Sequence, residues 1–335
     1  MKYLQGRKEF DLVIREDKIP IPQFNQVLVR ILACGICGTD IHYLKKSTNY
    51  QPLGHEISAI VVSIGENVTK VTVGEMVVVE DASPCGSCDN CKNGEFYLCR
   101  NTTGLNGQSG MGEYLVVHEN NLVKCSNLTK EQATFVEPSA VAFTACLQAD
   151  IREDKSLIIW GMGVQALMCV ALGKYFHAKE IICVGHREES AKSRKCEQLA
   201  MELGATEVTY TRYLKTREHL RDENCSVIVT SPPSTLTEAI RLVGYGSVIV
   251  PFGIALDDST KTVIDLDDMI LNKKQIKTVL TEPSCYFPRC IKLIEKEVIP
   301  TRRLLTHRIS LTDTEQFRKI YMGDEAVVKG IIVNE

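Results

Sequence analysis

Four closely spaced cysteines carry the clearest chemical signal in this sequence. Cys85, Cys88, Cys91 and Cys99 follow a C-x2-C-x2-C-x7-C pattern. Zn²⁺ prefers four soft ligands in a tetrahedral arrangement, and thiolates at this spacing can fold back on a single ion. The pattern therefore predicts a closed, structural zinc site in a lobe that spans residues 84–100.

A second group of metal ligands is suggested earlier in the chain. Cys37 is followed, after a long intervening segment, by the triplet Gly54-His55-Glu56. A cysteine, a histidine and a carboxylate from distant segments can bind zinc and leave one coordination position open, where the ion acts as a Lewis acid. This combination predicts a catalytic zinc site, so that two zinc ions are expected in each chain.

The cysteines also have other interpretations. Disulfides need an oxidising compartment, but the N-terminus lacks the basic and apolar segments of a secretion signal, so we expect a cytoplasmic protein with reduced thiols. Cys34 and Cys37 form a C-x-x-C pair that could be a redox dithiol, although no thioredoxin-like sequence surrounds it. The remaining cysteines, such as Cys169 and Cys183, are expected to be small core residues.

Length and charge narrow the class of partner. With 335 residues, the chain is long enough for two domains. A net charge of −3 gives no basic excess for nucleic acid, and no apolar run reaches the roughly 18 residues of a membrane helix. We therefore expect a small-molecule substrate, and neither a nucleic-acid partner nor a membrane.

The pattern of apolar residues changes near residue 150. Before it, short runs such as Val27–Ala33, Ile60–Ile64, Met76–Glu80 and Tyr114–His118 are separated by glycine turns, which predicts an all-β domain. After it, apolar strands alternate with longer helical stretches, which predicts a parallel sheet with crossover helices. Six strands are expected there, the number in a complete dinucleotide-binding fold. They are Ser156–Trp160, Ile181–Val184, Glu207–Tyr210, Ser226–Thr230, Ser247–Pro251 and Ile276–Leu280.

These patterns divide the chain into three segments. Residues 1–146 are expected to form the β-rich domain, and residues 147–281 the dinucleotide-binding domain. The tail, residues 282–335, offers one helix, Tyr286–Lys296, and one strand, Gly330–Val333, and is expected to return to the first domain.

A glycine-rich turn follows the first strand of the expected parallel sheet. Ser156–Trp160 runs into Gly161-Met162-Gly163-Val164-Gln165-Ala166, a G-x-G-x-x-A motif that precedes a long apolar stretch. Gly161 and Gly163 would allow a tight turn and close approach of a pyrophosphate. Val164, Gln165 and Ala166 would begin the helix whose N-terminal amides face it. The alternative is a βα turn that is merely tight.

The end of the second strand bears on the choice of cofactor. An NAD-binding fold places an acidic residue there to bind the ribose 2′-hydroxyl. This chain instead has Gly185, followed by His186 and Arg187, and a guanidinium can bind a 2′-phosphate. We therefore favour NADP(H) over NAD(H). The alternative is that Arg187 is a solvated loop residue and that the cofactor is NAD.

Together these motifs resemble the zinc-dependent medium-chain dehydrogenase/reductase family, the alcohol dehydrogenase-like proteins, over essentially the whole chain. The residues that carry the resemblance are Gly35-Ile36-Cys37-Gly38-Thr39-Asp40-Ile41-His42, Gly54-His55-Glu56, the four lobe cysteines, Glu137-Pro138 and the Gly161–Ala166 turn. The resemblance implies an α/β protein. Its catalytic domain would be GroES-like and β-rich, and its Rossmann domain would hold a doubly wound, six-stranded parallel sheet.

The resemblance also implies the ligands of the catalytic zinc. Cys37 and His55 match two of them, and Glu137, followed by proline, matches the third ligand of the polyol and sugar dehydrogenases. With Cys37 and Glu137 as its anionic ligands the zinc site is formally neutral. Since Glu56 would make it anionic, Glu56 is expected to exchange with other ligands or to lie just outside them. The alternative for Glu137 is a carboxylate that simply begins a helix.

Thr39, Asp40 and His42, which follow Cys37 closely in the sequence, match residues with known roles in the family. Thr39 corresponds to the hydroxyl that begins a relay from the substrate alcohol to solvent, and His42 corresponds to a histidine that can extend it. A solvated or hydrogen-bonded role is the alternative for His42. Asp40 corresponds to a carboxylate that orients the zinc-bound histidine. The lobe is implied to stiffen a projecting loop and to help subunits meet, in a homodimer or homotetramer.

The sequence favours a hydrophilic secondary alcohol as substrate. The polyol-type glutamate and the second carboxylate point to a polyol, a sugar or a cyclitol, including amino-substituted cyclitols. A small aliphatic secondary alcohol or threonine is the alternative within the same enzyme class. An alternative of another class is a protein that binds NADPH or zinc without turnover.

Overall fold

The computed structural model describes residues 1–186, 190–216, 220, 223–230, 235–253, 261–280, 285–322 and 326–334. The chain divides into two units. Unit 1 comprises Met1–Ala140, Thr281–Glu297 and Thr301–Glu335, and unit 2 comprises Val141–Leu280 and Val298–Pro300. None of the helices within the described ranges is long and apolar enough to cross a membrane.

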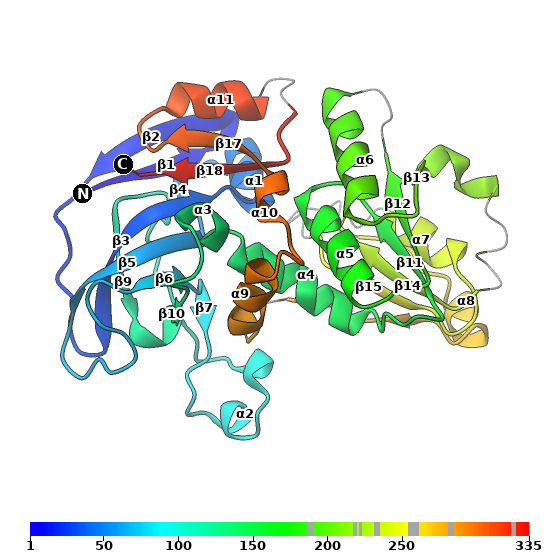
Figure 1. Cartoon of the computed structure of the whole chain (residues 1–335), viewed down its shortest axis with the longest axis horizontal. Helices are drawn as coiled ribbons and strands as arrows, with labels where there is room; N and C mark the ends of the chain where they lie inside the picture. Colours follow the sequence, from blue (N-terminus) through cyan, green and yellow to red (C-terminus); the bar gives the residue numbers. More distant parts are fainter. Residues whose placement is uncertain are drawn as a thin grey trace. The chain divides into compact units, whose positions relative to one another are not determined.

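Unit 1 is built on a seven-stranded sheet in the order β10-β6-β5-β3-β18-β17, with β9 also paired to β3 (Figure 1). These strands are β3 (Gln26–Gly35), β5 (Glu56–Ile64), β6 (Met76–Val79), β9 (Tyr114–His118), β10 (Leu122–Lys124), β17 (Leu305–Ser310) and β18 (Lys329–Val333). The smaller strands are β1 (Lys2–Arg7), β2 (Asp11–Glu16), β4 (Gln51–Pro52), β7 (Ala82–Ser83) and β8 (Thr103–Gly104). Alternate side chains of β3 and β5, such as Val29, Ile31 and Ile57, enter one apolar core.

Unit 1 also contains helices, so the expectation of an all-β domain was wrong. They are α1 (Gly38–Lys46), α2 (Asp89–Lys92), α3 (Lys130–Ala133) and the first turns of α4 (Val136–Gln148), with the short 3-10 helices η1 (Lys8–Phe10), η2 (Phe96–Leu98) and η3 (Glu119–Asn121). The signal for α1 was present in the sequence. The Asp40 carboxylate accepts a hydrogen bond from the backbone N–H of Cys37, which is how an acidic residue in the first turn closes a helix start.

The tail holds more structure than the sequence suggested. The expected helix and strand are present as α9 (Phe287–Glu295) and β18, but the tail also forms α10 (Thr301–Leu304), β17 and α11 (Thr314–Met322). The amphipathic pattern of α11 was overlooked: its Phe317 and Ile320, three residues apart, are both buried. β18 runs antiparallel to β3, with Ile331 opposite Gly35. The end of the chain therefore lies beside the strand that leads to Cys37.

Unit 2 is a six-stranded, wholly parallel sheet in the order β13-β12-β11-β14-β15-β16. Its strands are β11 (Ser156–Trp160), β12 (Glu180–Gly185), β13 (Glu207–Tyr210), β14 (Cys225–Val229), β15 (Val248–Pro251) and β16 (Gln275–Ile276). Its helices are α5 (Val164–Tyr175), α6 (Ala191–Leu203), α7 (Leu236–Leu242) and α8 (Leu266–Leu271), with η4 (Thr211–Thr216) after β13. Numbered along the chain, the strand order is 3-2-1-4-5-6, which confirms the Rossmann expectation.

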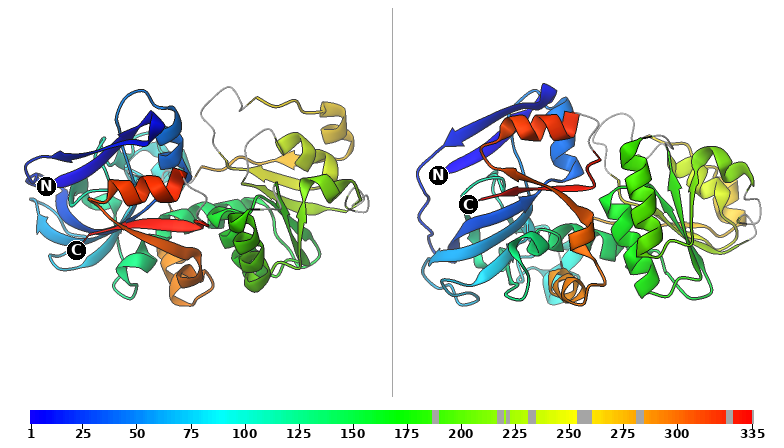
Figure 2. Two further views of the ribbon diagram at one scale, coloured as in Figure 1. Left: turned by 90° about the horizontal axis from the view of Figure 1, so that it is seen from above. Right: turned by 45° about the horizontal axis from the view of Figure 1, so that its top comes forward.

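Burial explains why the interior strands of unit 2 were predicted well and the edge strand β16 was predicted poorly. Every residue of β11 is buried, as expected for an interior parallel strand with helices on both faces of the sheet (Figure 2). β16 lies at the edge and spans only Gln275–Ile276, so the sixth strand is present but its expected bounds, Ile276–Leu280, were wrong. Leu280 is 61% exposed, and its apolar side chain therefore did not mark a buried strand.

Gly54 offers a test of how tightly the backbone next to His55 is packed. Gly54 has a φ of +85°, and a Cβ atom there would lie 2.6 Å from the Cys34 Sγ and 2.9 Å from the Met111 backbone nitrogen. Gly74 has a similar φ of +92° but no atom within 4 Å of such a Cβ. Both alanine variants pay for a left-handed backbone, but only Gly54→Ala also creates an overlap. We expect Gly54→Ala to lose about 1–3 kcal/mol more unfolding free energy than Gly74→Ala.

The measurement is urea denaturation of both variants beside the unaltered protein. Equal losses from the two substitutions would show that the backbone around Gly54 yields freely.

Candidate active site

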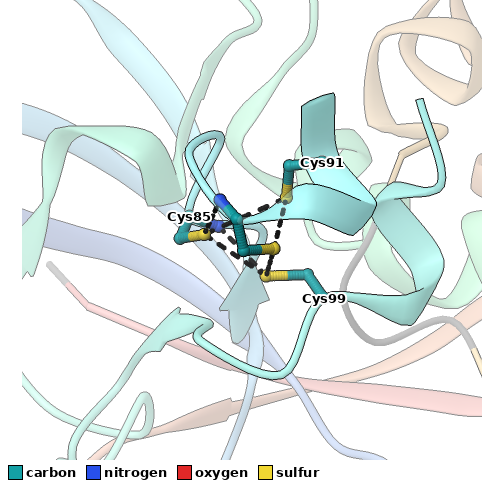
Figure 3. Close-up of side chains that lie close together, drawn as sticks. Cys85, Cys91 and Cys99 are labelled. Carbon is teal, nitrogen blue, oxygen red and sulfur yellow. Dashed lines mark hydrogen bonds between the residues drawn. The ribbon is translucent and has the colours of Figure 1, made fainter. Parts of the chain in front are cut away.

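The four lobe cysteines converge in space as their spacing predicted (Figure 3). Their ligand atoms all lie within 4.8 Å of one another. The Cys88 Sγ is 3.5 Å from the Cys91 Sγ and 3.8 Å from the Cys99 Sγ, and the Cys85 Sγ is 3.6 Å from the Cys99 Sγ. Zn–S bonds of about 2.3 Å in a tetrahedron place sulfur atoms about 3.8 Å apart, whereas a disulfide bond is about 2.0 Å long. The donor set therefore fits a tetrahedral metal ion.

The backbone of the lobe favours thiolates at this site. The backbone N–H groups of Ser87 and Cys88 each donate to the Cys85 Sγ at 3.4 Å. Together with the Ser87 hydroxyl, the largest influence, they lower the pKa of Cys85 to about 6. Zinc binds the thiolate form, so these donors prepare Cys85 for the ion.

The second predicted group of ligands also comes together. The ligand atoms of Cys37, His55 and Glu56 lie within 4.8 Å of one another. Cys37 caps the start of α1, while His55 and Glu56 stand at the start of β5. The antiparallel pairing of Gly35 with Glu56 brings these two segments to the same end of the sheet. A thiolate, an imidazole and a carboxylate in this arrangement suit a zinc ion.

Asp40 ties the two ligand-bearing segments to each other. Its Oδ2 accepts a hydrogen bond from the Cys37 N–H at 2.9 Å, and its Oδ1 accepts one from the Gly54 N–H at 2.8 Å. The side chain is buried, with only 1% of the residue exposed. Asp40 therefore joins the backbone of the Cys37 segment to that of the Gly54 segment, and its expected action on His55 stays a prediction.

His55 is electrostatically matched to its neighbours. Burial alone lowers the pKa of His55, but the hydrogen bond and charge of Cys37, with the charges of Asp40 and Glu137, raise it well above its usual value. The same negative charges that attract a proton to this imidazole would attract a metal cation. The negative charges around His55 can therefore stabilise either a proton on the imidazole or a metal cation bound to it.

Glu137 interacts electrostatically with His55 and Glu56, but it is not one of the residues whose ligand atoms lie closest together. Burial raises the pKa of Glu137 to about 8; His55 and Lys329 lower it, while Asp81 and Glu56 raise it. Among the described residues, the set within 4.8 Å contains Glu56 and does not contain Glu137. Glu137 stands in the first turn of α4, as its proline neighbour suggested. Its role as third zinc ligand stays a prediction.

Lys329 is a site residue that the sequence reasoning missed. Its Nζ forms a buried ion pair with the Glu56 carboxylate and donates to the backbone oxygen of Ile36 at 3.1 Å. The side chains of Lys329 and Glu56 are only 2% and 1% exposed. The available signal was a lysine at the start of the otherwise apolar final strand. Lysines are rarely buried without a partner, so its sequence context marked it for a specific role.

Thr39 and His42 lie close to Cys37 on α1. They are three residues apart, which places them on neighbouring positions of the helix surface. The Cys37 Sγ is 3.8 Å from the Thr39 Oγ1, and Thr39 is exposed. Burial and the charges of Lys46 and Lys45 lower the pKa of His42, so a neutral imidazole is favoured. Both side chains can therefore exchange protons, although their relay role stays a prediction.

The glycine turn in unit 2 has the form that a dinucleotide requires. Gly161 has a φ of +123°, and its N–H donates to the Val184 oxygen at 2.8 Å, which bends the chain out of β11. A Cβ at Gly163, which caps α5, would have no atom within 4 Å, so the backbone there is open to a ligand. Val164 begins α5, Ala166 is buried, and Gln165 has a buried Oε1 without a hydrogen-bond partner among the described residues.

The structure at the end of β12 leaves little space for a side chain at Gly185, where an NAD-binding fold would place an acidic residue. Gly185 is the last residue of β12, and a Cβ there would lie 2.5 Å from the Met162 Cε and 3.0 Å from the Tyr210 ring. His186, which follows, is exposed. Arg187, on which the prediction of NADP(H) depends, lies outside the described residues.

Comparisons with known proteins agree with this architecture. Residues 23–127 match the model of the alcohol dehydrogenase GroES-like domain. The chain is 28% identical over 330 residues to a sorbitol dehydrogenase of Bombyx mori, covering 90% of each protein. It is 26% identical over 336 residues to an L-threonine 3-dehydrogenase of Paraburkholderia phymatum, covering 95% of each. A zinc-binding dehydrogenase of Sinorhizobium meliloti, solved with NADP, superposes with a TM-score of 0.83 at 25% identity, covering 99% of both chains.

The chain resembles the zinc-type medium-chain dehydrogenases over nearly its whole length. The relatives include a sorbitol dehydrogenase, so the comparisons support an oxidoreductase similar to the polyol branch of these proteins. The comparisons thus support a zinc ion, a nicotinamide cofactor and a small alcohol substrate.

The two cysteine sites are expected to respond differently to substitution. Cys88→Ser removes a thiolate from the lobe, where zinc affinity contributes directly to folding, so this variant should lose one zinc ion and melt at a lower temperature. Cys37→Ser should keep a melting temperature close to that of the unaltered enzyme and lose turnover. Metal analysis, thermal melting and a hydride-transfer assay measure all three properties. Loss of catalysis without loss of stability in Cys88→Ser would contradict this division of roles.

Asp40→Asn tests whether one carboxylate holds both ligand segments. The amide can replace only one of the two accepting oxygens, so either Cys37 or Gly54 loses its hydrogen bond. We expect the affinity for the catalytic zinc to fall about 10- to 100-fold, as measured by competition with a chelator. Asp267→Asn is the matched control, because it removes an exposed carboxylate from the first turn of α8. Unchanged zinc retention in Asp40→Asn would rule out the proposed tie.

Proposed function

We propose that this protein is a dehydrogenase that transfers hydride between NADP(H) and a secondary alcohol or ketone, with a polyol, a sugar or a cyclitol, including amino-substituted cyclitols, as its substrate class. The observation that supports this proposal most directly is the convergence of Cys37 and His55 at the end of one sheet, with the Glu56 carboxylate beside them. The dinucleotide turn in unit 2 provides the binding element for the second reactant.

Zinc would be held by Cys37, His55 and Glu137, leaving one position for the substrate oxygen. When bound, the ion supplies Lewis acidity that lowers the pKa of a coordinated hydroxyl. The Thr39 hydroxyl would accept the released proton, and the His42 imidazole, kept neutral by its surroundings, would pass it toward solvent. Asp40 would hold the segments that carry Cys37 and His55 at a constant distance from each other during the reaction.

A further carboxylate supports a substrate with several hydroxyl groups. Asp81 follows β6, whose Val79 pairs with Ile57 of β5, and its charge acts on Glu137. The Asp81 Oδ1 accepts a hydrogen bond from the adjacent Ala82 N–H at 3.1 Å, and no cation of the described ranges pairs with this carboxylate. Its remaining lone pairs are suited to substrate hydroxyl or amino groups. The sorbitol dehydrogenase relative agrees with a polyol, and the threonine dehydrogenase relative keeps an amino alcohol as the second candidate.

NADP(H) is favoured by the end of β12. Gly185 and His186 occupy the positions where an acidic residue would repel a 2′-phosphate, and Arg187 can bind one through two parallel hydrogen bonds. The Sinorhizobium meliloti relative was solved with NADP, which supports this choice. A homodimer or homotetramer is proposed on the family resemblance.

The deciding experiment measures the absorbance of reduced nicotinamide while NADP⁺ and NAD⁺ are each offered with polyols, cyclitols, threonine and simple secondary alcohols. Arg187→Ala should raise the KM for NADP⁺ about 10- to 100-fold, because it removes charge-assisted hydrogen bonds, and should leave the KM for NAD⁺ nearly unchanged. Arg194→Ala, at an exposed position on α6, is the matched control.

A preference for NAD⁺ that Arg187→Ala does not alter would contradict the cofactor assignment. Fully zinc-loaded protein that oxidises none of these alcohols and reduces none of the matching ketones would support a non-catalytic binding protein instead.

A further inference from the structure

We propose that Lys329 is a positioning residue that holds Glu56 away from the catalytic metal and so keeps one coordination position free for the substrate. This inference rests on the proposed zinc site at Cys37 and His55. It assigns a function to a lysine from the opposite end of the chain.

The sheet brings Lys329 to the metal site. β18 pairs with β3 through Ile331 and Gly35, and the Ile36 N–H donates to the Gly330 oxygen at 3.0 Å. The continuing register places Lys329 level with Cys37. The Lys329 Nζ then donates to the Ile36 oxygen, a residue 293 positions earlier in the sequence, at 3.1 Å.

The structure makes room for Glu56 on the side that faces Lys329. Gly35 lies directly against the Glu56 carboxylate, because a Cβ at Gly35 would be 1.8 Å from the Glu56 Oε2. The same Oε2 forms the ion pair with Lys329. The carboxylate is therefore drawn toward the backbone of β3, and any side chain at position 35 would displace it.

Without this lysine, Glu56 would compete for the metal. Its ligand atom is already within 4.8 Å of those of Cys37 and His55, and glutamate oxygen is a common zinc ligand. Within the described part of the chain, Lys329 is the cation that forms an ion pair with Glu56. A buried carboxylate that loses its cation is strongly driven to find another one, and the metal ion is the nearest candidate.

The charges around the metal give the same result. The Cys37 thiolate and the Glu137 carboxylate would balance the two charges of Zn²⁺, and Lys329 balances Glu56. Binding of Glu56 to zinc would leave the metal group with a net negative charge and fill its open position. Both changes would hinder an anionic oxygen ligand, so the ion pair protects the Lewis acidity of the ion.

The test uses cobalt in place of zinc, because the visible spectrum of Co²⁺ reports its ligands. The full-length protein is loaded with Co²⁺ and titrated with imidazole, which binds an open coordination position and alters the spectrum. Lys329→Met should bind imidazole at least about tenfold more weakly than the unaltered protein, because Glu56 then occupies that position. Lys329→Arg, which keeps the charge, should bind imidazole much as the unaltered protein does.

The double variant separates displacement by Glu56 from general damage. In Lys329→Met with Glu56→Gln the carboxylate is absent, so imidazole binding should return close to the level of the unaltered protein. Imidazole affinity that is unchanged in Lys329→Met, or that is not restored in a folded, cobalt-loaded double variant, would overturn the inference. If Lys329→Met does not hold cobalt, Lys329→Gln replaces it under the same criteria, because its amide can still donate to the Ile36 oxygen.

The same titration distinguishes this inference from the proposed function. Unaltered protein whose cobalt spectrum is insensitive to both imidazole and the Cys37→Ser substitution would overturn the metal site itself. A responsive metal site in the unaltered protein, combined with normal imidazole binding by Lys329→Met, would overturn only the role of Lys329.

Discussion

The pairing of β3 with β5 on one side and with β18 on the other is the constraint on which the active site depends. β3 ends just before Cys37, β5 begins just after His55, and β18 begins at Lys329. Because Gly35 lies opposite Glu56 in one pairing and opposite Ile331 in the other, the three segments meet at one end of the sheet. A one-residue slip in either register would turn the side chains of that strand to the other face.

Buried charge is concentrated at this end of the sheet. Asp40, Glu56 and Lys329 are all nearly inaccessible to solvent, yet each has a specific partner: two backbone amides for Asp40, and one another for Glu56 and Lys329. Buried ion pairs contribute little to stability on average because of the cost of removing both charges from water. Their presence next to predicted metal ligands is better explained by control of the ligands than by a contribution to folding.

The two candidate metal sites obtain their geometry in different ways. The lobe sulfurs are brought together by a short segment whose turns place Cys85, Cys88 and Cys91 around a common centre, with Cys99 closing it. The second site depends on a sheet whose strands come from both ends of the chain. Damage to the lobe is therefore a local folding problem, whereas damage to the second site can come from any of the strands that support it.

By itself, the sequence determined the features that depend on near neighbours. The lobe cysteines, the glycine turn after β11 and the six-stranded parallel sheet of unit 2 were predicted because spacing and periodicity encode contacts within one element or its immediate successor. The helix α1 and the additional tail elements α10, β17 and α11 were missed because short elements give weak periodic signals. Only the tertiary structure decided that Glu56 pairs with Lys329 and that Asp40 holds two backbone segments. These contacts join residues far apart in the chain, and they exist only because sheet register places them side by side, which no local pattern of residues encodes.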